Sequence, residues 1–276
     1  TSTYLVSVVP SRSTTMGVVP CCLRTAVAIS SKVDTGVSPT LTTTSPDSMP
    51  ASAAGPGPED YAAQLLDYVH GRGCSTVLPS DVLTIGDTMY LHVMVNEGLG
   101  NVLRTEIHRS TDDGRTWEPT GAEFATRLEG GHRQLWTWET GGDGWVYVLS
   151  TGFQRDKGVI LMRVREEHLA DPDLSHWQTW GFEKGEWGWG KPTTVVLPGR
   201  VGEMYLRRCE DFWTLTYFNA EHYRIDCLTF GRIGADLLDP AVTTHTTLLP
   251  GCAWGDESDG TDPAAGHQAQ QHPAQA

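Results

Sequence analysis

A chain of 276 residues is long enough for one large all-β domain or for two ordinary domains. Its 10 Trp and 30 Gly favour many short strands joined by tight turns over a helical bundle. The net charge of −14 repels phosphate backbones and therefore argues against nucleic-acid binding. No apolar run is long enough to span a membrane.

Residues 1–58 form a first segment that is rich in Ser, Thr and Pro and contains no Trp or Phe. The run Thr42-Thr-Thr-Ser-Pro46 and the Ala/Gly/Pro stretch after it are typical of a linker. Such a segment buries too little apolar surface to offset its ordering entropy, so the composition predicts disorder.

Residues 59–258 have a different character, with strand-like runs that recur at short intervals. The runs 88–95, 145–150 and 212–218 are β-branched and aromatic, and each follows a Gly- or Asp-rich turn. Aligned on Asp87, Asp143 and Asp211, the turns lie 56 and 68 residues apart. A period of this length that contains several strands predicts the blades of a β-propeller. The only expected helix is short, at 166–170.

The sharpest motif is Ser110-Thr-Asp-Asp-Gly-Arg-Thr-Trp117, which matches the Asp-box pattern. We expect Gly114 to adopt a positive φ, Asp112 to accept hydrogen bonds from turn amides, and Trp117 to pack beneath the turn. Asp112 and Asp113 are therefore interpreted as turn residues and not as catalytic ones.

Residues 259–276 form a tail of Ala, Gln, His and Pro for which we expect disorder. Its His267 and His272 are not read as metal ligands, since low-complexity tails often carry histidine. The six cysteines show no repeated metal-ligand spacing. The sequence therefore predicts neither a metal site nor a cofactor.

From Cys74 to Asp259 the chain resembles the domain of unknown function 4185, a bacterial family of which some members are classed as glycoside hydrolase family 183. The segments that carry the resemblance are Tyr90-Leu-His-Val-Met94, 109–117, Gly130-Gly-His-Arg-Gln134, 150–156, Gly202-Glu-Met-Tyr-Leu-Arg-Arg208, 217–219, 223–226 and 251–255. The resemblance implies a five-bladed propeller, secreted or attached to the cell envelope, that cleaves internal D-arabinofuranosyl linkages of cell-wall arabinan. The resemblance does not extend to either end of the chain. We therefore expect an incomplete propeller of about four blades with impaired activity.

Glycoside hydrolysis needs two carboxyl groups that flank the scissile bond, and in a propeller they come from different blades. Glu203 opens a strand beside apolar residues and could act as a general acid; its alternative is an ion pair with Arg207 or Arg208. Asp226 is the second candidate, and its alternative is a buried ion pair with Arg224 or Arg208. Asp81 could orient substrate or tune the acid, and its alternative is a turn or strand cap.

Polar residues at strand ends are the candidates for binding a polysaccharide or oligosaccharide substrate, because strand ends line propeller clefts. They are His132, Gln134, Arg155, Asp156, Asn219 and Tyr223. Each could instead tie loops together. The pairs Trp136/Trp138 and Trp187/Trp189 face one side of a strand and could stack on sugars or fill the core. The preferred hypothesis is a glycosidase of the endo-D-arabinanase type, and the rival is a non-catalytic carbohydrate-binding or structural propeller.

Overall fold

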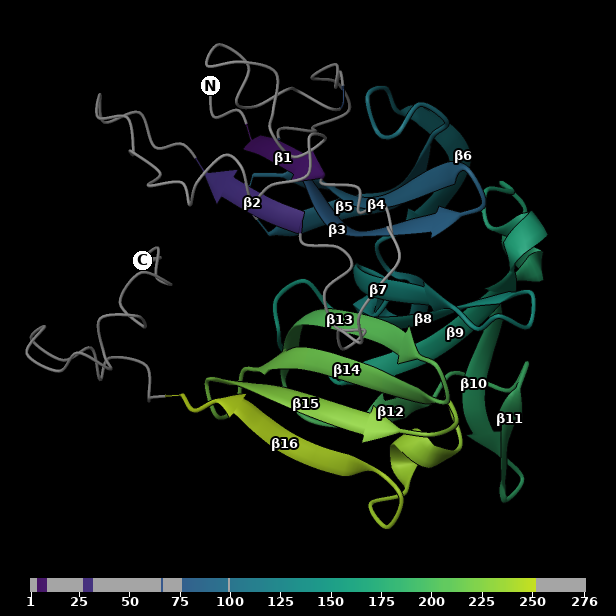
Figure 1. Cartoon of the computed structure of the whole chain (residues 1–276), viewed down its shortest axis with the longest axis vertical. Helices are drawn as coiled ribbons and strands as arrows, with labels where there is room; N and C mark the ends of the chain where they lie inside the picture. Colours follow the sequence, from purple (N-terminus) through teal and green to yellow (C-terminus); the bar gives the residue numbers. More distant parts are fainter. Residues whose placement is uncertain (1–3, 9–26, 32–65, 67–75, 99, 252–276) are drawn as a thin grey trace, which may run out of the picture.

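The fold is described from a computed structural model, which describes residues 4–8, 27–31, 66, 76–98 and 100–251 (Figure 1). These residues form an all-β protein of antiparallel sheets, as the composition predicts. Three sheets contain four or more strands, and a fourth consists of β1 (Tyr4–Val8) and β2 (Val27–Ser31). In the described chain the only helical segments are short 3₁₀ turns.

The first sheet is a meander in which each strand pairs with the next one along the chain. Its strands are β3 (Thr76–Ile85), β4 (Thr88–Glu97), β5 (Asn101–Ser110) and β6 (Glu118–Ala125). A register shift between Pro79 and Asp81 marks a β-bulge in β3. A bulge bends its strand and re-aims the side chains that follow, and the first of these is Asp81.

The second sheet follows the same meander and gains one strand from farther along the chain. Its strands are β7 (Leu135–Thr140), β8 (Trp145–Thr151), β9 (Val159–Arg165), β10 (Gln178–Glu183) and β11 (Glu186–Trp189), with β12 (Val195–Leu197) paired to β9. The 3₁₀ turn η2 (Leu128–Gly131) precedes β7, whereas η3 (Glu166–His168) and η4 (Leu174–His176) connect β9 to β10. The helix expected at 166–170 is therefore a single 3₁₀ turn.

The third sheet has the order β13-β14-β15-β16. Its strands are β13 (Val201–Cys209), β14 (Phe212–Asn219), β15 (Arg224–Phe230) and β16 (Thr244–Leu249), and η5 (Asp236–Leu238) precedes β16. The three strands predicted from the repeat are confirmed as β4, β8 and β14. Each is the second strand of its sheet, so Asp87, Asp143 and Asp211 mark equivalent first turns.

The second sheet lies between the other two (Figure 1). Its strands β7, β8 and β9 are buried on both faces, which explains their nearly continuous apolar residues. Val146 and Val148 pack toward the first sheet, while Tyr147 and Leu149 pack toward the third. Trp136 and Trp138 are almost completely buried in the first of these layers. This tryptophan pair therefore fills the core and is not available for stacking on sugars.

Two predicted boundaries fall mostly on residues that the structure does not describe. Within residues 1–58, for which disorder is expected, the described parts are the paired strands β1 and β2. Short β-branched and aromatic runs such as Tyr4-Leu-Val-Ser-Val8 favour strand pairing. The overall composition of residues 1–58 does not reveal them, because it is dominated by Ser, Thr and Pro. The tail 259–276 lies outside the described residues. Among those described, no helix has the length and apolar character to cross a membrane.

Candidate functional site

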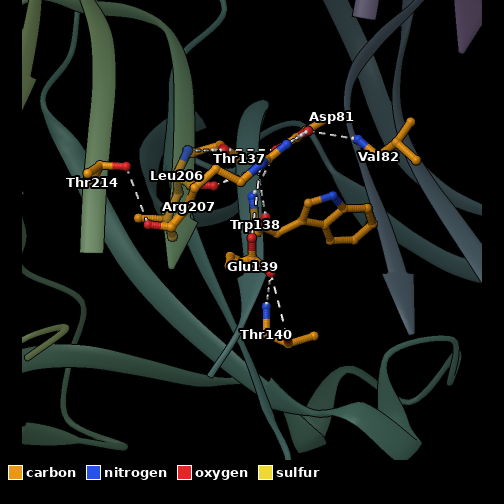
Figure 2. A network of polar contacts seen from close by, with 9 residues as sticks. All are labelled: Asp81, Val82, Thr137, Trp138, Glu139, Thr140, Leu206, Arg207 and Thr214. Atoms are coloured by element: carbon orange, nitrogen blue, oxygen red, sulfur yellow. Dashed lines mark hydrogen bonds and ion pairs between the residues drawn. The ribbon is translucent and has the colours of Figure 1, made fainter. Parts of the chain in front are cut away.

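The first strands of the three sheets, β3, β7 and β13, lie side by side and are joined by polar contacts (Figure 2). The hydroxyl of Thr137 on β7 donates a hydrogen bond to Oδ2 of Asp81 on β3, at 2.8 Å. The same hydroxyl accepts a hydrogen bond from the backbone N–H of Leu206 on β13, at 2.7 Å. One side chain therefore connects the three large sheets.

Asp81 is the centre of this network and is only 2% exposed. Its Oδ1 accepts hydrogen bonds from the N–H of Val82 (2.8 Å) and from Nη2 of Arg207 (3.1 Å). Its Oδ2 accepts from Thr137, from the N–H of Trp138 (3.3 Å) and from Nη1 of Arg207 (3.3 Å). Asp81 lies in the middle of β3, directly after the bulge. It is a buried ion-pair partner and not a turn or strand cap.

Glu139, on the same face of β7 as Thr137, is a carboxyl group that sequence reasoning missed. Its Oε2 lies 4.0 Å from Nε of Arg207, and its side chain is 20% exposed. Burial raises the pKa of Glu139, although a backbone hydrogen bond at Thr140 and the charge of Arg207 oppose this shift. The available signal was the pair Thr137 and Glu139, two polar residues at i and i+2 that alternate with tryptophans in this strand.

Arg207 stays charged in this buried setting because two carboxyl groups surround it. Burial disfavours the guanidinium charge, but Asp81 above all, and then Tyr205 and Glu139, outweigh that effect and raise the pKa of Arg207. The guanidinium carbon also lies 3.5 Å from the ring centroid of Tyr205. Arg207 was considered only as an alternative partner for Glu203, whereas the structure pairs it with Asp81.

A second set of candidate site residues lies at the starts of β7 and β13 and in the β4–β5, β8–β9 and β14–β15 loops. We call this region the loop edge. Gln154 donates a hydrogen bond to the carbonyl of Gly100 at 2.6 Å, which joins the first two of these loops. Arg155 of the β8–β9 loop donates to both carboxylate oxygens of Glu203 on β13, with Nε to Oε2 at 3.0 Å. The side chains of Arg155 and Glu203 are 44% and 58% exposed.

Aromatic rings flank the Arg155–Glu203 pair. The guanidinium of Arg155 lies 5.6 Å from the ring centroid of Phe218, and Tyr223 meets Phe218 edge-on at 5.3 Å. The hydrogen bonds that Arg155 donates to Glu203 raise the pKa of Arg155 against the effect of its burial. The loop edge therefore presents an ion pair that solvent can reach, beside two half-buried aromatic rings. The sequence predicted both Arg155 and Glu203 as site residues but did not predict that they pair.

Asp226 lies apart from that ion pair, buried between the strands of the third sheet. Its four side-chain partners are Asn219, Arg224, Thr247 and His245. Burial opposes ionisation, but the hydrogen bonds from these partners outweigh it and lower the pKa of Asp226 to about 2. This is the buried ion pair with Arg224 that the sequence left open as the alternative.

The remaining predicted contact residues make polar contacts within the loops and between them. Nδ1 of His132 lies 2.7 Å from the carbonyl oxygen of Glu129. Gln134 donates to the hydroxyl of Thr126 (2.7 Å) and accepts from the N–H of Phe153 (3.0 Å). Asp156 pairs with Lys157 at 2.9 Å and is exposed, as is Arg155 beside it. All of them lie at the loop edge.

The turn at 110–117 is organised around Asp112 at the end of β5. The Asp112 carboxylate accepts hydrogen bonds from the hydroxyl of Ser110 and from both the N–H and the hydroxyl of Thr116. Hydrogen bonding to Thr116 and Ser110 lowers the pKa of Asp112 to about 2. Gly114 has a φ of +80°, and Trp117 donates to its carbonyl at 3.0 Å. The predicted hydrogen bonds and backbone conformation are present, and they assign Asp112 to turn structure.

The fold and site together define an all-β protein in which the first strands of three antiparallel sheets share a buried carboxylate–guanidinium network. The chain belongs to the family described as domain of unknown function (DUF4185), whose model matches residues 30–256. The match covers all three large sheets, including β3, β7 and β13. The family predicted from the sequence segments is thus confirmed.

Curated relatives and solved structures resemble different parts of the chain. An uncharacterized 35.9 kDa protein of Mycolicibacterium smegmatis is 26% identical over 201 residues, which is 68% of this chain and 56% of that protein. The notoamide biosynthesis cluster protein J' of Aspergillus versicolor is 37% identical over 89 residues, 32% of this chain and 24% of that protein. The chain thus spans about a quarter to just over half of these relatives.

Two solved structures resemble the chain only distantly. A crystallised protein of Bacteroides ovatus aligns over 64% of this chain and 46% of its own, with a TM-score of 0.43 and 12% identity. A bifunctional GH43-CE protein of Bacteroides eggerthii aligns over 61% of this chain and 19% of its own, with a TM-score of 0.40 and 11% identity.

Proposed function

We propose that the chain is a glycoside hydrolase-like β-propeller domain that acts on D-arabinofuranosyl linkages of bacterial cell-wall arabinan. The three large sheets are its blades: each is an antiparallel meander, and their first strands meet through Thr137. The substrate class follows from the resemblance to glycoside hydrolase family 183. An arabinan substrate implies an extracellular or cell-envelope location.

The observation that carries this proposal is the exposed Arg155–Glu203 pair with Phe218 and Tyr223 beside it. Sugar rings are recognised by hydrogen bonds to their hydroxyl groups and by contact with aromatic surfaces. The guanidinium supplies several donors, the carboxylate supplies acceptors, and the two rings supply apolar surface. These are the contacts that a neutral furanosyl chain requires, and an overall negative charge does not repel such a ligand.

The three candidate carboxyl groups have different roles in this proposal. Glu203, exposed and hydrogen-bonded to a guanidinium, is suited to act as a base or to bind sugar hydroxyls, not as the general acid. Asp81 is a positioning residue that holds Arg207 among the first strands. Asp226 is also a positioning residue: it orients Asn219, whose Oδ1 accepts the N–H groups of Glu221 and His222 and so shapes the loop that carries Tyr223.

A non-catalytic carbohydrate-binding domain is the second candidate, and the burial of the carboxyl groups favours it. Hydrolysis needs two carboxyl groups that flank one glycosidic bond. Of the three predicted candidates only Glu203 is exposed, whereas Asp81 and Asp226 are buried and fully paired. Among the described residues, Glu139 beside Arg207 is one candidate for the second carboxyl group of a hydrolase.

Incubation of the full chain with purified cell-wall arabinan distinguishes the two candidates. Product analysis measures released arabino-oligosaccharides, and affinity electrophoresis in arabinan gels measures binding. We expect release of oligosaccharides, lost in Glu203→Gln and kept in Glu183→Gln, a matched change on the exposed β10–β11 hairpin. If the chain binds arabinan, the Glu203→Gln variant binds it more weakly, and no oligosaccharide is released at any pH, the result supports the non-catalytic binding domain. Absence of both binding and release refutes both candidates.

A further inference from the structure

Two histidines and an aspartate meet on the connection between β9 and β10. They are His168 at the end of η3, Asp171 in the turn after it, and His176 at the end of η4; we call them the His–Asp–His cluster. About a third of each side chain is exposed. Sequence analysis did not predict a metal site here, because the spacing of these residues matches no common metal-binding motif.

The geometry of the cluster is close to that of a metal site. Oδ2 of Asp171 lies 3.6 Å from Nδ1 of His168 and 3.6 Å from Nε2 of His176. All three potential ligand atoms lie within 4.8 Å of one another. In a tetrahedral site with bonds of about 2.0 Å, neighbouring ligand atoms are about 3.3 Å apart. If the aspartate oxygen moved a few tenths of an ångström closer to each histidine nitrogen, these distances would match those between neighbouring ligand atoms of such a site.

The imidazole rings must turn out of their stacked arrangement to share an ion. They are stacked, with centroids 3.7 Å apart and planes 3° from parallel. Their lone pairs lie in the ring planes, so ligation of one ion requires each ring to rotate about χ2. This rotation is open to side chains that are a third exposed.

The backbone that carries the cluster is held in place on both sides. Oδ1 of Asp171 accepts the N–H of Asp173 at 2.9 Å, which leaves Oδ2 to face the histidines. Asp173 in turn caps η4 by accepting the N–H of Ser175 at 2.9 Å. Leu169 is fully buried and Trp177 nearly so, both in the core layer between the first and second sheets. Contacts of this kind orient metal ligands.

We propose that the His–Asp–His cluster binds a divalent transition-metal ion of the Zn²⁺ type through two imidazole nitrogens and one carboxylate oxygen. Nitrogen and oxygen ligands of this kind suit zinc and its neighbours rather than Mg²⁺ or Ca²⁺. Oδ2 of Asp173, 3.8 Å from Nε2 of His176, is in reach as a further ligand. The ion fastens η3 to η4 over the boundary between two sheets and so has a structural role.

This site is independent of the proposed carbohydrate site. The loop with Arg155 leads into β9, whereas His168 follows the other end of the same strand. The segment between β9 and β10 that carries the cluster packs against β6. Pro172 of this segment lies so close to Gly121 of β6 that an added Cβ there would be 3.2 Å from it. Metal binding and arabinan binding can therefore be measured and lost separately.

Titration of the full chain with Co²⁺ and then Zn²⁺ tests the proposal. Visible absorption of Co²⁺ distinguishes nitrogen and oxygen ligands from thiolate, which separates this site from the cysteines. We expect one equivalent of non-thiolate Co²⁺ that Zn²⁺ displaces, with a rise in Tm. We expect His168→Ala and His176→Ala to weaken this binding at least about tenfold, as loss of a metal-site residue typically does.

The control variant is His222→Ala, on the exposed β14–β15 loop, which should bind Co²⁺ as the unmodified chain does. Far-UV circular dichroism and Tm without metal establish that each variant is folded, and Asp171→Asn gives a milder test with almost the same shape. The proposal is overturned if the unmodified chain binds no non-thiolate Co²⁺. It is equally overturned if folded His168→Ala, His176→Ala and Asp171→Asn variants bind Co²⁺ as tightly as His222→Ala.

Discussion

Removal of the Asp81 carboxylate should destabilise the protein more than any surface change. In Asp81→Ala the charge of Arg207 stays buried without its partner, and the loss of one member of a buried ion pair costs about 3–5 kcal/mol. The N–H groups of Val82 and Trp138 and the hydroxyl of Thr137 lose their acceptor too, and each buried unsatisfied donor adds about 1–3 kcal/mol before relaxation. We expect a total of at least about 4 kcal/mol, a large part of the about 5–15 kcal/mol typical of a domain.

Urea denaturation followed by tryptophan fluorescence measures this free energy. Asp81→Asn, Arg207→Met and the double variant complete a double-mutant cycle, in which we expect a coupling energy of about 2 kcal/mol or more. The matched control is Glu118→Gln, which breaks the exposed Arg109–Glu118 pair (2.7 Å) and should change stability by less than about 1 kcal/mol. A loss below about 1 kcal/mol in Asp81→Ala, or additive effects of Asp81→Asn and Arg207→Met, would refute the reasoning.

Three further predictions concern the core, the turns and acid stability. Trp136→Ala should lose about 3–5 kcal/mol of unfolding free energy in urea, since this ring is almost completely buried; a loss below 1 kcal/mol contradicts that packing. Gly181→Ala should lower Tm sharply because its Cβ would lie 1.7 Å from the carbonyl oxygen of Pro192, whereas Gly188→Ala meets only a flexible lysine; equal Tm values for the two contradict the reasoning. The pKa of Asp226 is about 2 in the fold and 3.8 in the reference state, so its contribution, on the order of 2 kcal/mol, is complete above about pH 4 and falls as pH drops toward 2. Asp226→Asn should flatten that slope in acid urea titrations, and an unchanged slope contradicts the assignment.

Local features of the fold could be predicted from the sequence, because they depend on neighbouring residues. The turns at Asp87, Asp143 and Asp211 and the strands that follow them are confirmed, since turn chemistry and β-branched runs act within a few positions. The turn around Asp112 has the predicted hydrogen bonds for the same reason. Strand lengths and the number of strands in a sheet depend on packing between sheets, and no local pattern gives them.

Candidate site residues were predicted with less success, because burial and pairing are set by contacts between distant segments. The alternative to a catalytic role for Glu203 was an ion pair with Arg207 or Arg208, which follow it on its own strand. Glu203 instead pairs with Arg155, from a loop of another sheet. Residues four apart are neighbours on a helix, but in a strand they lie about 13 Å apart, since a strand rises about 3.3 Å per residue. A preference for partners close in sequence is therefore misleading in an all-β chain.

The same argument explains why Glu139 escaped notice and why it bears on function. An apolar context was taken as the sign of a raised pKa, and Glu203 and Asp226 were chosen on that basis. Sequence neighbours in a strand point to opposite faces, however, so the apolar neighbours of a carboxylate need not surround it. Glu139 follows Trp138 but faces Arg207, and it is the burial of the strand as a whole that raises its pKa. If a general acid exists among the described residues, its physical requirements point to Glu139 more than to the exposed Glu203.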